Sequence, residues 1–398
     1  FSANLIIFNL NNIHLLNPYL FRTIKPNFMN YKLSLIFLIL FSCNQAFSLL
    51  NINSNDSNIY SNFNFSGDTI NETKDTVRIT AVGDIMMGTN YPNKSYLPPN
   101  DGKMLLDSVK QFLEKGDLTF GNFEGVIGLG GKPKSCNNPK FCYTFRMPES
   151  YISNIKNSGI DLLSIANNHA NDFGEGGRQS TAKILDSAGL FYAGSIDKPF
   201  TVFELNGVKY GFLSSAPNSG CFNMKNYSKA VEYVSFLDSI CDIVIVSFHG
   251  GAEGYKAIHT PKNDEIYLGY NRGSVYKFSH DCIDAGADLL PGHGPHVTRA
   301  VELYKDRFIS YSMGNFCTYA RFNLKGPNGV SPIFDIKLNK EGVFISAGVI
   351  PVKQIGEGIP IVDENKGAWN YIVDLSKEDF PESPLLFDDN KCLILKSN

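Results

Sequence analysis

The sequence lacks an excess of charge of either sign. Its 398 residues include 36 lysines and arginines against 39 aspartates and glutamates, which gives a formal net charge of −3. Proteins that bind nucleic acid rely on a basic surface to neutralise phosphates. This composition therefore predicts no nucleic-acid partner, and it contains no block of like charge that would form an electrostatic tail.

The sequence also lacks an apolar run near its start that could span a membrane. Residues 33–41 are apolar, whereas a spanning helix needs about 20 such residues. The run follows Met29 and Lys32, and a positive flank before a short apolar stretch is typical of a secretion signal. We therefore predict a signal peptide over 29–48 and export to the periplasm or cell envelope.

Two outcomes of signal cleavage remain open. Residues 40–43 resemble a bacterial lipobox, which would leave a lipid on Cys43 and anchor the chain to the membrane. Plain cleavage after residues 46–48 would instead release a soluble protein. On either reading, residues 1–28 are interpreted as an over-extended N-terminus. Residues 49–76, rich in Asn, Ser, Asp and Thr, are predicted to form a flexible linker.

No pair of cysteines is separated by only two residues, which argues against a thiolate zinc site. Of the eight cysteines, seven remain when Cys43 is set aside. Cys136 and Cys142 are the local candidates for a disulfide in an exported protein.

Short apolar runs alternate with helix-like stretches through the middle of the chain, which predicts an α/β fold. The predicted strands are 77–82, 118–120, 160–165, 243–246, 287–290 and 308–312, and the predicted helices include 105–114, 177–188 and 274–285. We place one domain at 77–355. Residues 356–398 carry mixed signals and are treated as a C-terminal extension.

Each predicted strand ends in glycine, asparagine or a charged or imidazole side chain. Because ligands collect beyond the carboxyl ends of strands, we expect these side chains to meet at one edge. They are Asp84, Asn122, Glu124, Asn168, His169, His249, His293, His296 and Asn315. Carboxylate, amide and imidazole together suit one or two divalent ions such as Mn, Fe or Zn.

Six ordered segments carry a family resemblance: GDIMMG at 83–88, GNFEG at 121–125, ANNHANDFG at 166–174, SFHGGAE at 247–253, GHGPHV at 292–297 and YSMGNF at 311–316. They resemble the CapA family of bacterial capsule (poly-γ-glutamate) biosynthesis proteins over roughly residues 77–320. That family is similar to the calcineurin-like metallophosphoesterases. The resemblance implies a four-layer α-β-β-α sandwich with two central sheets flanked by helices.

The resemblance also implies roles for individual residues. The implied metal ligands are Asp84, Glu124, Asn168, His249, His293 and His296, and the implied catalytic pair is Asn168 with His169, whose imidazole faces the leaving group. The residues predicted to support the ligands or the substrate are Asn122, Asp172, Glu253 and Asn315. Met86 departs from the pattern because it stands where the superfamily places a histidine, and a thioether is a poor ligand for a hard ion.

The function implied by the resemblance is capsule or exopolymer biosynthesis, with a metal-dependent hydrolase-type site acting on an anionic polymer or phosphoester. A capsule-synthesis membrane complex is the implied partner. Two alternatives remain: a non-catalytic polymer-binding or export accessory, which Met86 favours, and a periplasmic metal-dependent phosphoesterase. His169 discriminates in part, since a scaffold needs no such imidazole.

Overall fold

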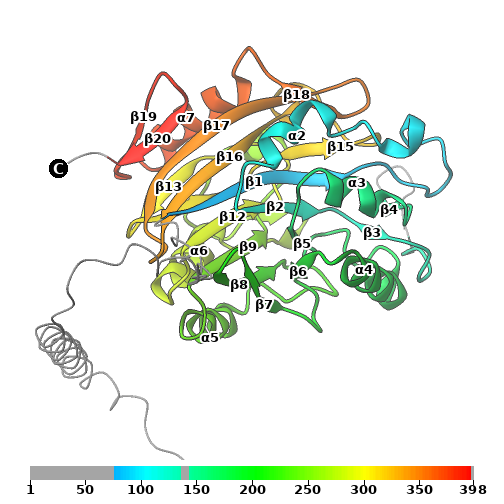
Figure 1. Ribbon diagram of the computed structural model, residues 1–398, viewed down its shortest axis with the longest axis horizontal. Coiled ribbons are helices and arrows are strands. Elements are labelled where there is room, and N and C mark those ends of the chain that lie inside the picture. Colours follow the sequence, from blue (N-terminus) through cyan, green and yellow to red (C-terminus); the bar gives the residue numbers. More distant parts are fainter. Residues whose placement is uncertain (1–75, 136–142, 396–398) are drawn as a thin grey trace, which may run out of the picture. The chain divides into compact units, whose positions relative to one another are not determined.

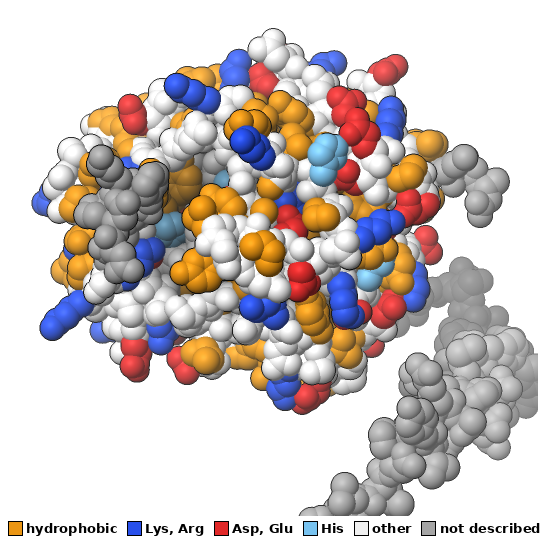
Figure 2. All heavy atoms as spheres, turned by 180° about the vertical axis from the view of Figure 1, so that it is seen from behind, with side chains coloured by type: hydrophobic (Ala, Val, Ile, Leu, Met, Phe, Trp, Pro, Cys, Tyr) orange, Lys and Arg blue, Asp and Glu red, His pale blue; other side chains and the backbone are white. Residues whose placement is uncertain are grey.

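The computed structural model describes residues 76–135 and 143–395, which lie in one compact unit, Glu72–Asn398. The predicted signal peptide with Cys43, nearly all of the predicted linker and the Cys136–Cys142 pair lie outside these ranges. No helix within the ranges combines the length and apolar character that crossing a bilayer requires. Positive and negative side chains are interspersed over the face seen in Figure 2.

The larger of the two main sheets contains ten strands. Its order is β19 (Leu385–Phe387), β20 (Cys392–Leu395), β17 (Phe344–Ile355), β16 (Val330–Asn339), β1 (Thr76–Met86), β2 (Leu118–Phe123), β5 (Leu162–Ser164) and β6 (Phe191–Ala193), with β15 (Asn315–Thr318) beside β1 and β18 (Ile359–Val362) beside β17. Strands β1, β2, β5 and β6 run parallel, and β15 is parallel to β1. The sheet continues on the other side of β1 as antiparallel strands.

The smaller main sheet contains six strands. Its order is β13 (Val301–Tyr304), β14 (Arg307–Ser310), β12 (Leu289–His293), β9 (Ile243–His249), β8 (Val208–Ser215) and β7 (Phe200–Leu205). The four middle strands are parallel, and every residue of β9 is buried. A strand covered on both faces is typically a continuous apolar run, which is why this strand was recognisable in the sequence.

Shorter elements lie in the connections. They are the strand pairs β3 (Val126–Ile127) with β4 (Arg146–Met147) and β10 (Ile266–Tyr267) with β11 (Tyr270–Asn271), and the 3-10 turns η2 (Pro99–Gly102), η4 (Tyr255–Ala257) and η5 (Gly326–Gly329).

The two main sheets pack face to face, and helices cover their outer faces (Figure 1). Helices α2 (Asp107–Leu113), α3 (Tyr151–Asn157) and α4 (Gly174–Ala188) lie on the larger sheet, and α5 (Tyr227–Asp238) and α6 (Val275–Asp284) lie on the smaller one. Phe120 of the larger sheet and Phe212 of the smaller meet edge to face in the central core, with ring centroids 5.7 Å apart. The predicted four-layer α-β-β-α sandwich is confirmed.

Local signals explain where several helices begin and end. The side chain of Ser274 accepts a hydrogen bond from the backbone N–H of Lys277 at 3.1 Å and caps α6, and Asn226 caps α5 in the same way. Helix α4 ends at Gly189, whose φ of 66° is a left-handed conformation that glycine adopts without strain. All six predicted strands and all three predicted helices are present, with boundaries shifted by a few residues.

The segment from residue 356 onward, treated above as an extension, contributes β18, α7 (Gly367–Asp379), β19 and β20. Strands β18 and β20 both pair with β17. Trp369 and Ile372 of α7 enter the core between the two sheets, and Leu375 joins the core on the outer face of the smaller sheet. This segment therefore packs as part of the sandwich.

The placement of α7 generates a stability prediction. Ile372→Ala removes a fully buried side chain and should lower the free energy of unfolding by about 2–5 kcal/mol. Ile345→Ala on β17 is the matched control, because that side chain is 41% exposed and should cost about 1 kcal/mol or less. Urea titrations followed by fluorescence would measure both, and equal losses would contradict the burial of α7 between the sheets.

Candidate metal centre

The polar strand ends come from both sheets. Asp84 in β1, Asn122 and Glu124 at the end of β2, and Asn168 after β5 belong to the larger sheet. His249 and His293 are the last residues of β9 and β12 in the smaller sheet. The sequence indicated a single shared edge, whereas the structure joins two edges, one from each sheet.

A chain crossing holds these two edges together. After β14 the chain leaves the smaller sheet and enters the larger one at β15, beside β1. On the way, the Met313 N–H donates to Gly292 O at 3.1 Å, and the Asp84 N–H donates to Gly314 O at 2.9 Å. A Cβ on Gly83 would lie 2.0 Å from Gly314 O, so this close approach requires glycine.

Two fully buried carboxylates occupy the junction. The Asn122 amide donates one hydrogen bond to Asp84 Oδ1 and one to Glu124 Oε2, both at 2.8 Å. Asn122 is held in turn by Asn167, whose amide donates to Asn122 Oδ1 at 3.4 Å and to Phe123 O at 2.7 Å. Asn122 therefore fixes both acids and leaves Glu124 Oε1 without a hydrogen-bond partner among the described residues.

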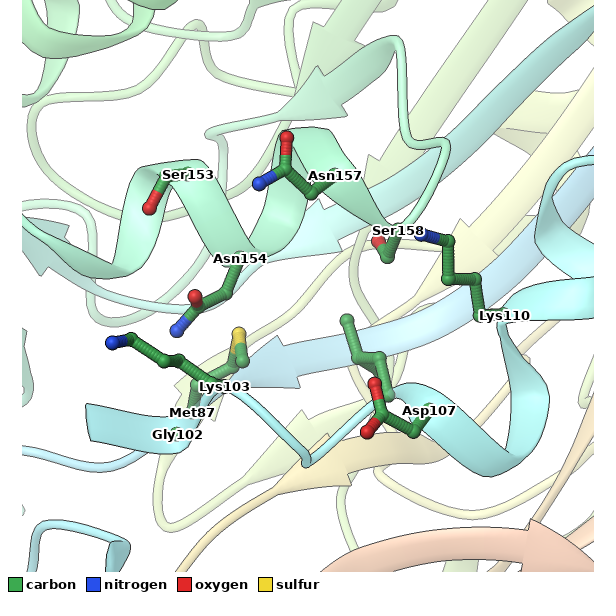
Figure 3. Close-up of a pocket in the computed structure, with 10 residues that line it drawn as sticks. Met87, Gly102, Lys103, Asp107, Lys110, Ser153, Asn154, Asn157 and Ser158 are labelled. Carbon is green, nitrogen blue, oxygen red and sulfur yellow. The ribbon is translucent and has the colours of Figure 1, made fainter. Parts of the chain in front are cut away.

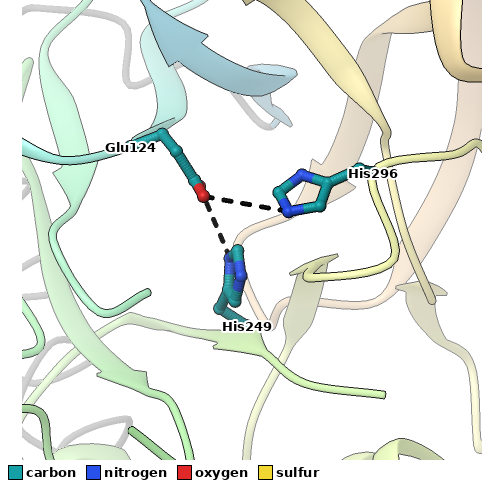
Figure 4. A group of neighbouring side chains, drawn as sticks. All are labelled: Glu124, His249 and His296. Atoms are coloured by element: carbon teal, nitrogen blue, oxygen red, sulfur yellow. Dashed lines mark ion pairs between the residues drawn. The ribbon is translucent and has the colours of Figure 1, made fainter. Parts of the chain in front are cut away.

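Three histidines face these carboxylates from the smaller sheet. His296 Nδ1 lies 2.9 Å from Asp84 Oδ2, and its Nε2 lies 3.9 Å from Glu124 Oε1. His293 Nδ1 is 3.3 Å from Asp84 Oδ1, and His249 Nδ1 is 3.7 Å from Glu124 Oε2. One donor atom each from Glu124, His249 and His296 fall within 4.8 Å of one another (Figure 4).

The electrostatics of the junction are dominated by its two buried acids and by His296, which faces both. Burial, followed by repulsion from Asp84, raises the pKa of Glu124. Burial also opposes ionisation of Asp84, but its contacts with His293 and His296 outweigh burial and lower its pKa. Burial likewise opposes protonation of His296, yet Asp84 and Glu124 raise its pKa above the usual range. Two acids placed together in the interior require a cation beside them.

At the junction, several buried oxygen and nitrogen atoms that could bind a metal ion have no hydrogen-bond partner among the described residues. They are Glu124 Oε1, Asn168 Oδ1, both ring nitrogens of His249 and both ring nitrogens of His293. Leaving such groups unpaired costs about 1–3 kcal/mol each unless a ligand satisfies them. A carboxylate, an amide oxygen and neutral imidazoles form a donor set that suits a divalent transition-metal ion. The chemistry of the residues present therefore fits the metal that the sequence predicted.

His169 stands beside this cluster in a network of its own. Its Nδ1 lies 2.8 Å from Asp172 Oδ2, which also accepts a hydrogen bond from the Phe145 N–H at 2.7 Å. Lys134 Nζ lies 2.5 Å from the other oxygen of Asp172. The Phe145 ring packs on the imidazole with centroids 4.2 Å apart. Asp172 therefore contacts His169 and holds the orientation of its ring.

The two remaining predicted residues differ in what they contact. The Asn315 amide donates to His296 O at 3.2 Å and to Asn328 O at 3.0 Å, so it supports the backbone of His296. Glu253 Oε1 accepts a hydrogen bond from Arg272 Nη1 at 2.8 Å. Arg272 was missed in the sequence because it lies in a polar loop with no periodicity and outside every motif.

A separate hollow of about 310 Å³ lies between α2 and α3 (Figure 3). Its lining includes Lys103, Lys110, Asn154 and Asn157, and it contains none of the predicted site residues. The metal-type donors therefore converge elsewhere, at the junction of the sheets.

Comparison with known proteins gives consistent results. Residues 78–320 match the family described as bacterial capsule synthesis protein PGA_cap. The chain is 28% identical over 260 residues to the capsule biosynthesis protein CapA of Bacillus anthracis, covering 60% of this chain and 59% of that protein. It is 29% identical over 262 residues to the PGA biosynthesis protein CapA of Bacillus subtilis (strain 168), covering 61% and 63%. The chain thus spans about six tenths of the length of these relatives.

Among solved structures, the NAD nucleotidase of Haemophilus influenzae matches with a TM-score of 0.37 and 11% identity, covering 75% of this chain and 56% of that one. The family match covers more than half of the chain and includes each of the six motifs and the junction that they build. The chain belongs to the bacterial capsule synthesis protein family PGA_cap.

Proposed function

We propose that this protein is an exported, metal-dependent enzyme of the hydrolase type that acts on an anionic polymer during capsule synthesis. The observation that carries the proposal is the convergence of unpaired, buried donor atoms from both sheets, with Glu124 and His249 at its centre. The names of the Bacillus relatives, which refer to capsule and PGA biosynthesis, support poly-γ-glutamate as the polymer.

The cluster of acids and histidines could hold two ions, and more unpaired ligand atoms are available for one of them than for the other. Glu124, Asn168, His249 and His293 carry the donor atoms without hydrogen-bond partners, and we assign the principal ion to them. Asp84 and His296 already contact each other at 2.9 Å. A second ion on their side would lack a ligand, because Met86 is buried in β1 where the superfamily pattern has histidine.

A divalent ion in such a site supplies an activated water, whose pKa falls to about 7. The chain supplies the rest of the chemistry. Asp172 contacts His169 at Nδ1, which leaves Nε2 for exchange of a proton with the leaving group. The imidazole side chain is 10% exposed, so it lies at the mouth of the junction where a polymer can reach it.

A non-catalytic accessory is the second candidate, and the buried Met86 favours it. In that case the ion would stabilise the junction of the sheets and orient a polymer-binding surface without activating water. The His169–Asp172 pair supports the enzymatic proposal instead, since a scaffold has no use for an oriented imidazole at the mouth.

The metal assignment predicts the effect of His249→Ala. The variant should lose the Mn or Zn that the wild type retains, with an affinity at least about 100-fold weaker, because a direct ligand is removed. The matched control is His259→Ala, which removes a histidine that is paired with Asp379 at 2.8 Å outside the cluster. Elemental analysis of the purified proteins would measure this. A wild type without metal after exposure to Mn and Zn would refute the assignment.

The role of His169 predicts a separate effect. His169→Gln should lower kcat by about 10²–10⁴-fold and leave metal content unchanged, because only proton exchange is lost. Asp172→Asn should lower it in the same direction by releasing the ring. Assays on poly-γ-glutamate and on an aryl phosphodiester, each with the metal-loaded protein, would measure this and identify the bond class. If the wild type cleaves neither, the accessory role is the better account.

A further inference from the structure

Arg272 is a buried cation that the proposed chemistry does not use. Its side chain is 7% exposed, and its Nη1 atom forms an ion pair with Glu253 Oε1 at 2.8 Å. The Nε and Nη2 atoms are buried and have no hydrogen-bond partner among the described residues. Leaving N–H groups of a charged side chain unpaired in the interior is costly, so this edge of the guanidinium requires an acceptor.

The unpaired atoms form a fork. Nε–H and one N–H of Nη2 project in parallel from the same edge of a guanidinium, which matches two oxygens of one carboxylate or phosphate. Arg78 uses this same edge within the protein, since its Nε and Nη2 each lie 2.5 Å from an oxygen of Asp335. In Arg272 the equivalent edge has no hydrogen-bond partner within residues 76–135 and 143–395.

The fork belongs to the neighbourhood of the metal centre. The Gly251 N–H, two residues after His249, donates to Arg272 O at 3.3 Å, and the Arg272 N–H donates to Glu265 O at 2.8 Å. The positive charge of Arg272 contributes to the low pKa of His249, after burial and His296. Its partner Glu253 acts electrostatically on Glu124 and His296. The loop that carries Arg272 is therefore hydrogen-bonded to the loop that follows His249.

We propose that Arg272 is a substrate-binding residue whose Nε–Nη2 edge holds one oxyanion of the substrate, a carboxylate or a phosphate, beside the metal centre. This inference rests on the proposed function and adds the group that recognises the anionic polymer. Glu253 holds the guanidinium in place through Nη1 and leaves the fork for the substrate. The repeating carboxylates of a γ-glutamyl chain have the required geometry, as does a phosphoester.

The test removes the fork without leaving a buried charge unpaired. In the double variant Arg272→Gln/Glu253→Gln both partners become neutral, and replacing both members of a buried pair costs far less than removing one. The matched control is Arg307→Gln/Asp288→Asn, which neutralises an ion pair with a separation of 3.0 Å. Arg307 is the first residue of β14 and Asp288 directly precedes β12, so the pair lies at the ends of these strands that are far from His293. Isothermal titration of the full, Mn-loaded chain would use γ-glutamyl-glutamate and inorganic phosphate as probes.

We expect the wild type and the control to bind at least one probe, and the fork variant to bind it about 10-fold or more weakly with its Mn content intact. The preferred probe in the wild type identifies the oxyanion as carboxylate or phosphate. Equal affinity in the fork variant and the wild type would overturn the proposal and leave Arg272 as a partner of Glu253. Binding of neither probe by the wild type would also overturn it.

The metal proposal can fail separately. If the wild type holds no Mn, the enzymatic function falls, and the same titrations with the metal-free chain still decide the role of Arg272. Weaker binding by the fork variant would then retain the oxyanion site, and equal binding would remove it.

Discussion

The burial of Asp84 against Glu124 is the constraint on which the site depends. Two carboxylates joined through one Asn122 amide repel each other where water cannot screen them. Positive charge must stand beside them, and the fold supplies it by setting the histidines of one sheet against the acids of the other. The face-to-face packing of the sheets, the crossing before β15 and the glycine contact of Gly83 with Gly314 all maintain this opposition.

Much of this arrangement could be predicted from the sequence, because buried parallel strands have a recognisable pattern and polar residues follow them. Apolar runs such as 243–246 identified strands, and His249 could be predicted as a site residue because it stands at the end of that strand. The division into two sheets could be inferred only from the family resemblance, since periodicity shows that a strand is buried but not which strand lies beside it. For the same reason the pairing of β20 with β17, which α7 and β19 separate along the chain, could not be predicted from local signals.

The role of Arg272 could not be predicted from the sequence, for a different reason. An arginine in a polar loop is usually exposed, and nothing in the neighbouring residues indicates that Glu253 and the loop after β9 enclose it. Glu253, which the sequence predicted to support the ligands or the substrate, contacts this arginine. Met86 is the opposite case, because its departure from the pattern that the family resemblance implies was visible in the sequence, and the structure adds only that it is buried in β1. Arg272 and Met86 both lie within the sequence span that matches the capsule synthesis family.

The separation of the contacting residues along the chain has a consequence for the order of events in biosynthesis. Asp84 and His296 lie 212 positions apart and touch only when both sheets have assembled. Loops of that length close late, after local strands and helices have formed. A chain that is still being synthesised thus lacks the assembled cluster of acids and histidines. Should the cluster bind an ion as proposed, uptake would follow folding, and the metals present where folding finishes would influence which ion is acquired.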